Sequence, residues 1–144
     1  MHTNDKIYIA GHTGMVGSSI VRRLRELGYR NLVLKPRKEL DLSDYGQVST
    51  FFKSERPDYV ILAAAKCGGI GDNVSHPVDF LLDNLSIQNN IIKCSHKYKA
   101  KKLLFLGSSC IYPKECPQPM KEEYLLKIRS TSHIPRLRWM HFNN

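Results

Sequence analysis

Apolar residues along this chain recur with two alternating periods. Short runs of aliphatic, β-branched and aromatic residues, typical of strands, alternate with segments whose apolar positions recur every three to four residues, typical of amphipathic helices. The runs predict strands over residues 6–10, 31–35, 40–42, 59–65 and 102–107, and the periodic segments predict helices over residues 18–27, 44–54 and 77–98. Ser43 is the expected N-cap of the second helix, and Gly68, Gly69 and Gly71 predict a flexible loop.

Strands that alternate with helices predict an α/β fold, a doubly wound parallel sheet of the NAD(P)-binding Rossmann type. The run at residues 59–65 is apolar throughout, as expected of a strand covered by helices on both faces. In such folds ligands bind beyond the carboxyl ends of the strands. The segments at those ends are residues 11–17, 35–38, 63–69 and 107–110, so we expect a nucleotide site there.

The first of these segments has the form strand, glycine turn, helix. In the first helix, Leu27 is among the apolar positions expected to face the sheet. We expect Gly11 to allow the tight exit from the strand, Gly14 to let a pyrophosphate approach the backbone, and Gly17 to let the helix pack close. The helix N-terminus then offers free N–H groups to phosphate. An ordinary loop is the alternative. The loop residues predicted to contact the cofactor are Gly11, Thr13, Gly14, Met15, Val16 and Gly17.

The end of the second predicted strand indicates which cofactor is bound. NAD sites usually carry an acidic residue there, whereas NADP sites carry basic residues that meet the 2′-phosphate. The segment reads Lys35-Pro36-Arg37-Lys38, and Arg37 is suited to bidentate phosphate binding. NADP(H) is therefore favoured over NAD(H), the alternative being that these are solvated loop charges.

Length, charge and cysteine content limit the classes of protein to which this chain can belong. The 144 residues suffice for one domain, and the net charge of +9 divides into +4 for residues 127–144 and an interspersed +5 for the rest. The interspersed charge does not indicate a nucleic-acid surface, whereas nucleic-acid binding through the basic tail stays a third, weaker alternative. No apolar run approaches the length of a membrane span, and the N-terminus lacks the pattern of a signal peptide. Cys67, Cys94, Cys110 and Cys116 show no metal-ligand spacing, so we expect free thiols in a cytoplasmic protein without a metal.

Four stretches carry a family resemblance. IAGHTGMVGSSIVRRL, ELDLSD, LAAAKCGGI and KLLFLGSSCIYPKECPQPM, spread over residues 6–126, resemble the GDP-L-fucose synthases of the extended short-chain dehydrogenase/reductase family. The resemblance implies an NADP-dependent epimerase-reductase that converts GDP-4-keto-6-deoxy-D-mannose to GDP-L-fucose.

The same resemblance implies roles for single residues. Ser108 matches the serine that hydrogen-bonds the keto oxygen, and Cys110 matches the residue that removes a proton beside the ketone. Thr13 departs from the family, which often has arginine there, and leaves Arg37 with more of the 2′-phosphate contact. The further cofactor contacts implied are Asp41 near the adenine, the small-residue wall Ala63, Ala64 and Ala65, and Leu106, Gly107, Ser108 and Ser109 after the last strand.

The family also has a Tyr-x-x-x-Lys pair for the reduction, which we expect this chain to lack. Tyr124 has lysine one position early, and Tyr112 has Cys116 at the lysine position. Residues 127–144 match nothing in the family. We therefore expect a Rossmann domain over residues 1–126, a divergent basic tail over residues 127–144, and no substrate domain, as in a frameshifted, spliced or truncated chain. A non-catalytic nucleotide-binding or dimerisation module is the alternative.

Assembly follows from the resemblance too. Family members pair through the helix that matches residues 77–98 together with the helix that bears the tyrosine. With one of the two helices missing, Ile87, Ile91 and Ile92 should be exposed and the homodimer weakened.

Overall fold

The computed structural model describes residues 1–108, 111–113 and 115–125. They fall into two units, Met1–Leu106 and Gly107–Asn144. The described part of the second unit includes a short 3₁₀ helix, Glu122–Tyr124. The first contains the sheet and the long helices, and each unit is treated by itself.

The first unit is built on a parallel sheet in the order β2-β1-β3-β4. Its strands are β1 (Ile7–Ala10), β2 (Leu32–Val33), β3 (Tyr59–Leu62) and β4 (Lys102–Phe105). Pairing of Ala10 with Leu62 and of Leu62 with Phe105 aligns the carboxyl ends at one edge. The doubly wound α/β prediction is confirmed, and three of the strands end earlier than predicted.

One predicted strand is absent. Residues 40–42 form a turn region, in which the Leu40 N–H donates to the Pro36 carbonyl at 3.1 Å. Leu40 is nevertheless buried in the core, which explains why its neighbourhood has the apolar pattern of a strand.

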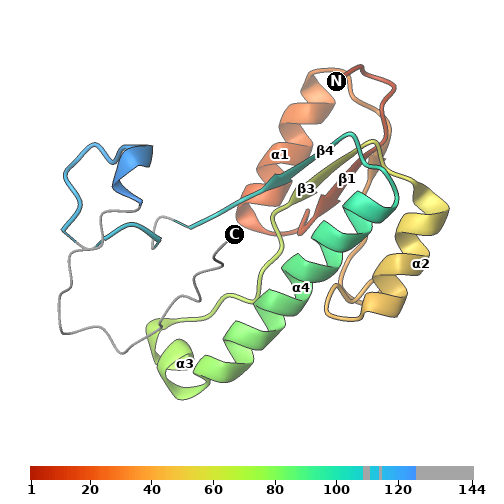
Figure 1. Ribbon diagram of the computed structural model, residues 1–144. Helices are drawn as coiled ribbons and strands as arrows, with labels where there is room; N and C mark the ends of the chain where they lie inside the picture. Colours follow the sequence, from red (N-terminus) through yellow and green to blue (C-terminus); the bar gives the residue numbers. More distant parts are fainter. Residues whose placement is uncertain (109–110, 114, 126–144) are drawn as a thin grey trace. The chain divides into compact units, whose positions relative to one another are not determined.

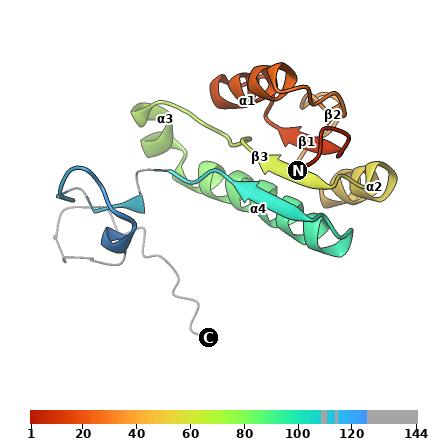
Figure 2. The ribbon, with the colours of Figure 1, turned by 90° about the horizontal axis from the view of Figure 1, so that it is seen from above.

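Helices cover both faces of the sheet (Figures 1 and 2). Along β1 successive side chains point to opposite faces, as strand geometry requires. Tyr8 and Ala10 join the core under α2 (Tyr45–Glu55) and α4 (Pro77–Lys97), whereas Ile7 and Ile9 join the core under α1 (Met15–Glu26). The three predicted helices are therefore confirmed as elements.

Four local expectations are wrong. Asp44, not Ser43, is the N-cap of α2, because its carboxylate accepts from the Gln47 N–H at 3.1 Å. Gly71 lies in a short helix, α3 (Ile70–Ser75), instead of a flexible loop. Leu27 is half exposed instead of facing the sheet, and Ile91 is fully buried.

A lysine joins two carboxylates at the amino-terminal edge of the sheet. Lys101 Nζ lies 3.1 Å from Asp5 Oδ1 and 2.9 Å from Asp58 Oδ1. The His2 N–H bond chiefly lowers the pKa of Asp5, the Lys6 N–H bond chiefly lowers that of Asp58, and the two carboxylates raise the pKa of Lys101 to about 12. This cluster ties the N-terminal turn to β3 and β4, at the edge opposite the strands' carboxyl ends.

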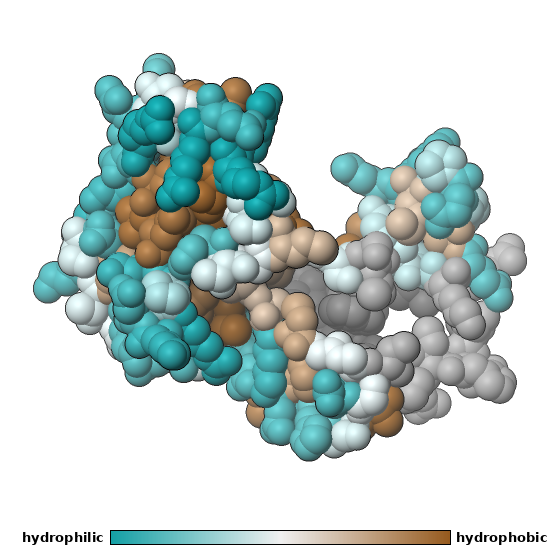
Figure 3. All heavy atoms as spheres, turned by 180° about the vertical axis from the view of Figure 1, so that it is seen from behind, coloured by the Kyte–Doolittle hydropathy of each residue, from teal (hydrophilic) through white to brown (hydrophobic). Residues whose placement is uncertain are grey.

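Seen from behind, apolar residues gather in a large area framed by hydrophilic side chains, and smaller apolar areas lie elsewhere on this face (Figure 3). In the described part of the chain, no helix combines the length and apolar character needed to cross a bilayer. The described cysteines are unpaired: Cys67 is exposed, Cys94 is buried and Cys116 is intermediate.

Candidate cofactor-binding site

The glycine loop between β1 and α1 is packed too closely to hold side chains at two positions. Gly11 has φ +84°, and a Cβ there would lie 2.7 Å from the Ala64 backbone nitrogen. A Cβ on Gly17 would overlap the Gly11 carbonyl oxygen. The loop therefore lies directly against the residues that follow β3, and α1 starts close to the end of β1, as predicted for a phosphate-binding turn.

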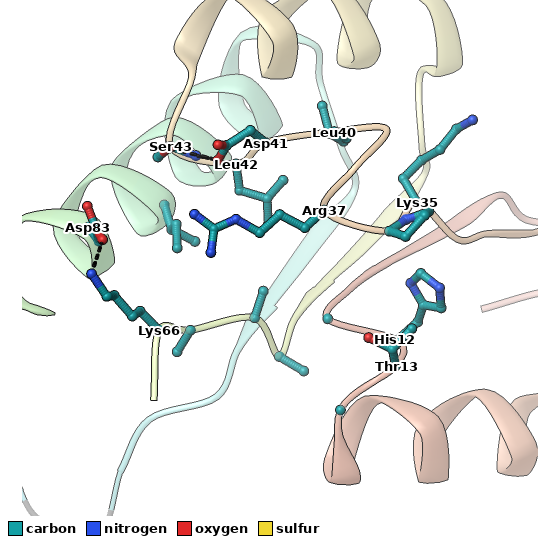
Figure 4. A pocket seen from close by; sticks show the side chains of 17 residues that line it. His12, Thr13, Lys35, Arg37, Leu40, Asp41, Leu42, Ser43, Lys66 and Asp83 are labelled. Carbon is teal, nitrogen blue, oxygen red and sulfur yellow. Dashed lines mark hydrogen bonds and ion pairs between the residues drawn. The ribbon is translucent and has the colours of Figure 1, made fainter. Parts of the chain in front are cut away.

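A cleft of about 260 Å³ opens at the carboxyl ends of β1, β2 and β3. Its volume lies just below the range of about 300–1,000 Å³ that is common for ligand pockets. The cleft is lined by residues from the glycine loop, the segment after β2, the segment after β3 and α4 (Figure 4). These are Gly11, His12, Thr13, Gly14, Lys35, Pro36, Arg37, Leu40, Asp41, Leu42, Ser43, Ala63, Ala64, Ala65, Lys66, Asp83 and Ile87.

Three cationic side chains line this cleft, and two of them are paired with carboxylates. Lys35 Nζ lies 2.9 Å from Glu39 Oε2, and Lys66 Nζ lies 2.6 Å from Asp83 Oδ2. The Arg37 side chain extends into the cleft between Leu42 and Lys66 (Figure 4). No hydrogen bond or ion pair joins Arg37 to another of the described residues. Its guanidinium is thus available to an anion in the cleft.

Asp41 is held in a tight turn beside Arg37. Its Oδ1 accepts from the Ser43 hydroxyl at 2.7 Å and from the Ser43 N–H at 3.0 Å. These two bonds, with a smaller contribution from the charge of Arg37, lower the pKa of Asp41. Asp41 is therefore a fixed carboxylate that can accept hydrogen bonds from a ligand.

His12 adds a polar atom to the glycine-loop side of the cleft. Its Nδ1 is buried and has no hydrogen-bond partner within the described part of the chain. A buried polar atom without a partner is uncommon in folded proteins. Together with the backbone cradle that a Cβ would fill at Gly11, it fits a site shaped for a ligand with hydrogen-bonding groups.

The structure brings together eight of the residues predicted from the sequence to form the cofactor site. Gly11, Thr13, Gly14, Arg37, Asp41, Ala63, Ala64 and Ala65 all line the cleft. Met15, Val16, Gly17 and Leu106 belong to the same unit but do not line it. Gly107 and Ser108 lie in the other unit, and Ser109 and Cys110 lie outside the described residues.

Sequence reasoning missed several lining residues. Lys66 and Asp83 lie on different elements and are brought together only by the fold. Ile87, expected to be exposed on α4, is partly buried and contributes to the cleft. Lys66 falls within residues 63–69, one of the strand-end segments where the sequence predicts a nucleotide site, but no contact was predicted for Lys66 itself.

The expected absence of a Tyr-x-x-x-Lys pair needs one correction, since Tyr98 and Lys102 have that spacing. Tyr98 is the C-cap of α4 and Lys102 is the first residue of β4, at the sheet edge opposite the cleft. The Tyr98 hydroxyl lies 2.8 Å from the Ser49 hydroxyl. The two residues do not share a helix and do not line the cleft.

Residues 7–133 match the NAD dependent epimerase/dehydratase family, so this family match extends seven residues beyond residue 126, where the resemblance was expected to end. GDP-L-fucose synthase 1 of Arabidopsis thaliana is 58% identical over 121 residues, which are 84% of this chain and 38% of that protein. The chain therefore spans well under half the length of this relative.

Two solved structures share the fold. GDP-mannoheptose C4 reductase (MlghC) from Campylobacter jejuni, with NADP bound, is 49% identical with a TM-score of 0.82, over 88% of this chain and 40% of that one. A GDP-L-fucose synthetase from Naegleria fowleri, bound to NADP, is 30% identical with a TM-score of 0.75, over 88% of this chain and 37% of that one.

Proposed function

Because this chain belongs to the NAD dependent epimerase/dehydratase family, we propose that it binds NADP(H) in the cleft beyond β1 and β3. We further propose that it represents the cofactor-binding part of an enzyme that makes GDP-L-fucose from GDP-4-keto-6-deoxy-D-mannose. The similarity to GDP-L-fucose synthases and to a GDP-mannoheptose C4 reductase supports a GDP-linked sugar as the substrate class.

The observation that carries the proposal is the position of Arg37. Its guanidinium extends into the cleft toward Lys66 (Figure 4), and the glycine loop lines another part of the same cleft. A guanidinium can bind a phosphate through two parallel hydrogen bonds, which a ribose hydroxyl cannot match. This arrangement favours the 2′-phosphate of NADP(H) over the 2′-hydroxyl of NAD(H).

In this proposal the other lining residues have complementary tasks. The backbone around Gly11 and Gly14 binds the pyrophosphate, and the Ala63–Ala65 segment lies against the adenosine half of the cofactor. Asp41 receives hydrogen bonds near the adenine. The bound cofactor supplies the hydride, whereas Ser108 would hold the keto oxygen and Cys110 would take a proton from the carbon beside it.

The assembled protein would have two further properties. Val78, Leu81, Leu82 and Ile92 are exposed apolar residues on α4, and we propose that this face takes part in self-association, weakly in this chain. We also propose a cytoplasmic location, which the free thiols favour.

Cofactor titration tests the central claim. NADPH and NADH are titrated separately into the purified chain while the fluorescence of the reduced nicotinamide is followed. We expect NADPH to bind more tightly, and we expect Arg37→Ala to remove most of that preference. Lys38→Ala is the matched control, because Lys38 is exposed and does not line the cleft. Equal affinities for both cofactors, or a preference that survives in Arg37→Ala, would refute the assignment.

A second candidate is a nucleotide-binding module without chemistry of its own. It is favoured by the lining of the cleft, which contains no tyrosine among the described residues, and by the position of Tyr98 away from it. Incubation of the chain with NADPH and GDP-4-keto-6-deoxy-D-mannose distinguishes the two. Binding without NADPH oxidation supports the module, whereas turnover supports the complete enzyme.

A further inference from the structure

Two asparagines of α4 hold the two loops that form facing sides of the cleft. We infer that Asn84 and Asn90 are positioning residues for cofactor binding: they fix the cleft walls at Lys66 and at Leu42–Ser43. The inference rests on the proposed binding of NADP(H) and adds to it the residues that keep the site in shape before the cofactor arrives.

Asn84 holds the wall that follows β3. Its Oδ1 accepts from the Lys66 N–H at 2.7 Å, and its Nδ2 donates to the Lys66 carbonyl at 3.0 Å. β3 ends at Leu62, so Lys66 lies beyond the sheet ladder. The amide of Asn84 therefore replaces, for this one residue, the donor and the acceptor that a neighbouring strand would provide.

Asn90 holds the opposite wall. Its Nδ2 lies 3.0 Å from the Leu42 carbonyl and 3.0 Å from the Ser43 carbonyl. Asn90 is 8% exposed, and asparagine is a poor residue for a helix interior. Burial of an amide is unfavourable unless it is hydrogen-bonded. The two bonds to the turn are what make asparagine suitable at this position.

The hydrogen bonds of Asn84 and Asn90 fix the backbone segments that surround Asp41 and Arg37. Ser43 binds the Asp41 carboxylate, so the bond from Asn90 also fixes the turn that presents Asp41. In Figure 4 the Arg37 guanidinium lies between this turn and Lys66. Because α4 is a continuous helix of 21 residues, it sets the spacing between the two walls. A preformed cleft loses less entropy when a ligand binds.

The test compares three identical substitutions on one helix. Asn84→Ala and Asn90→Ala each remove one tether, whereas Asn89→Ala makes the same change in helix propensity at an exposed position. For each variant, the NADPH dissociation constant, the melting temperature and the hydrogen exchange of the Lys66 amide are measured. Asp83→Asn is added because it removes the ion pair to Lys66 and leaves the Asn84 contact intact.

We expect Asn84→Ala and Asn90→Ala each to weaken NADPH binding by about tenfold, the value expected for one or two lost hydrogen bonds. Asn89→Ala should bind as the parent does. The Lys66 amide should exchange faster in Asn84→Ala and remain protected in Asp83→Asn. If Asn90→Ala fails to fold, Asn90→Leu fills the buried position without the tether, and the same loss of affinity is expected.

Parental NADPH affinity in folded Asn84→Ala and in the folded Asn90 variant would overturn the inference. So would loss of Lys66 protection in Asp83→Asn, since the ion pair would then hold the wall. A parental chain that binds no NADPH would refute the proposed function instead. The amide exchange of Lys66 would still decide whether Asn84 holds this wall.

Discussion

Replacement of Gly17 by alanine should destabilise the protein, although alanine is the better helix former. The new Cβ would overlap the Gly11 carbonyl oxygen and lie 2.9 Å from the His12 Cα. Both are backbone atoms, and Gly11 is itself packed against Ala63 and Ala64, so relief requires α1 to move away from β1. Overpacking costs about 1–3 kcal/mol and the gain in helix propensity is about 0.5–1 kcal/mol. With rigid backbone on both sides we expect a net loss of about 2 kcal/mol.

Thermal unfolding followed by circular dichroism measures this loss. For a chain of this size, about 2 kcal/mol corresponds to a melting temperature about 6–8 °C lower. Gly71→Ala is the control, because Gly71 is also helical and a Cβ there would meet nothing within 4 Å. It should be neutral or slightly stabilising. A Gly17→Ala protein that melts at or above the parental temperature would refute the close packing of α1 on the glycine loop.

Three further changes test other parts of the molecule. Thr13→Arg adds a second guanidinium to the cleft and should raise the preference for NADPH over NADH by about tenfold in the same titration. Lys101→Met should destabilise the protein by an amount that is constant between about pH 4 and pH 10. The stability difference between the parent and Lys101→Met should shrink at lower pH, where Asp5 and Asp58 become protonated as the pH falls through their lowered folded pKa values. It should also shrink at higher pH, where Lys101 loses its proton as the pH rises through its folded pKa of about 12. Urea unfolding at a series of pH values measures this difference. Leu82→Glu places a charge on the apolar face of α4 and should reduce self-association in sedimentation velocity, whereas unchanged association would exclude this face.

The order of the helices and strands could be predicted from the sequence, because the spacing of apolar residues shows which side chains are buried against the sheet. The prediction failed where a residue is buried but does not belong to a strand. Leu40 is as buried as a strand residue, but it lies in a turn that is closed by the hydrogen bond from its N–H to the Pro36 carbonyl. Ile91 was expected at the surface because the family resemblance assigns residues 77–98 to a dimer interface whose partner helix is missing. The side of α4 that faces the sheet depends instead on tertiary packing, which buries Ile91.

The residues of the candidate site likewise fall into those that the sequence predicted and those that depend on tertiary packing. Gly11 and Gly14 were predicted from the local glycine motif, and the Ala63–Ala65 run was predicted from the family resemblance. The tethers from Asn84 and Asn90 were not, because each joins residues that lie far apart in the sequence, 18 positions for the first and 47 to 48 for the second. No local pattern in a single sequence encodes such a contact.

The pairing of charges explains why cofactor selectivity should depend on one side chain. Lys35 and Lys66 already have carboxylate partners, Glu39 and Asp83, so a phosphate would have to displace a carboxylate to bind either lysine fully. Arg37 forms no hydrogen bond or ion pair with the described residues and extends into the cleft, although its charge acts on the nearby Asp41 carboxylate. A hydrogen bond to a charged group contributes about 1.5–3 kcal/mol, which corresponds to roughly tenfold to a hundredfold in affinity. A single guanidinium is therefore sufficient for a clear preference for the phosphorylated cofactor, and its loss is sufficient to remove it.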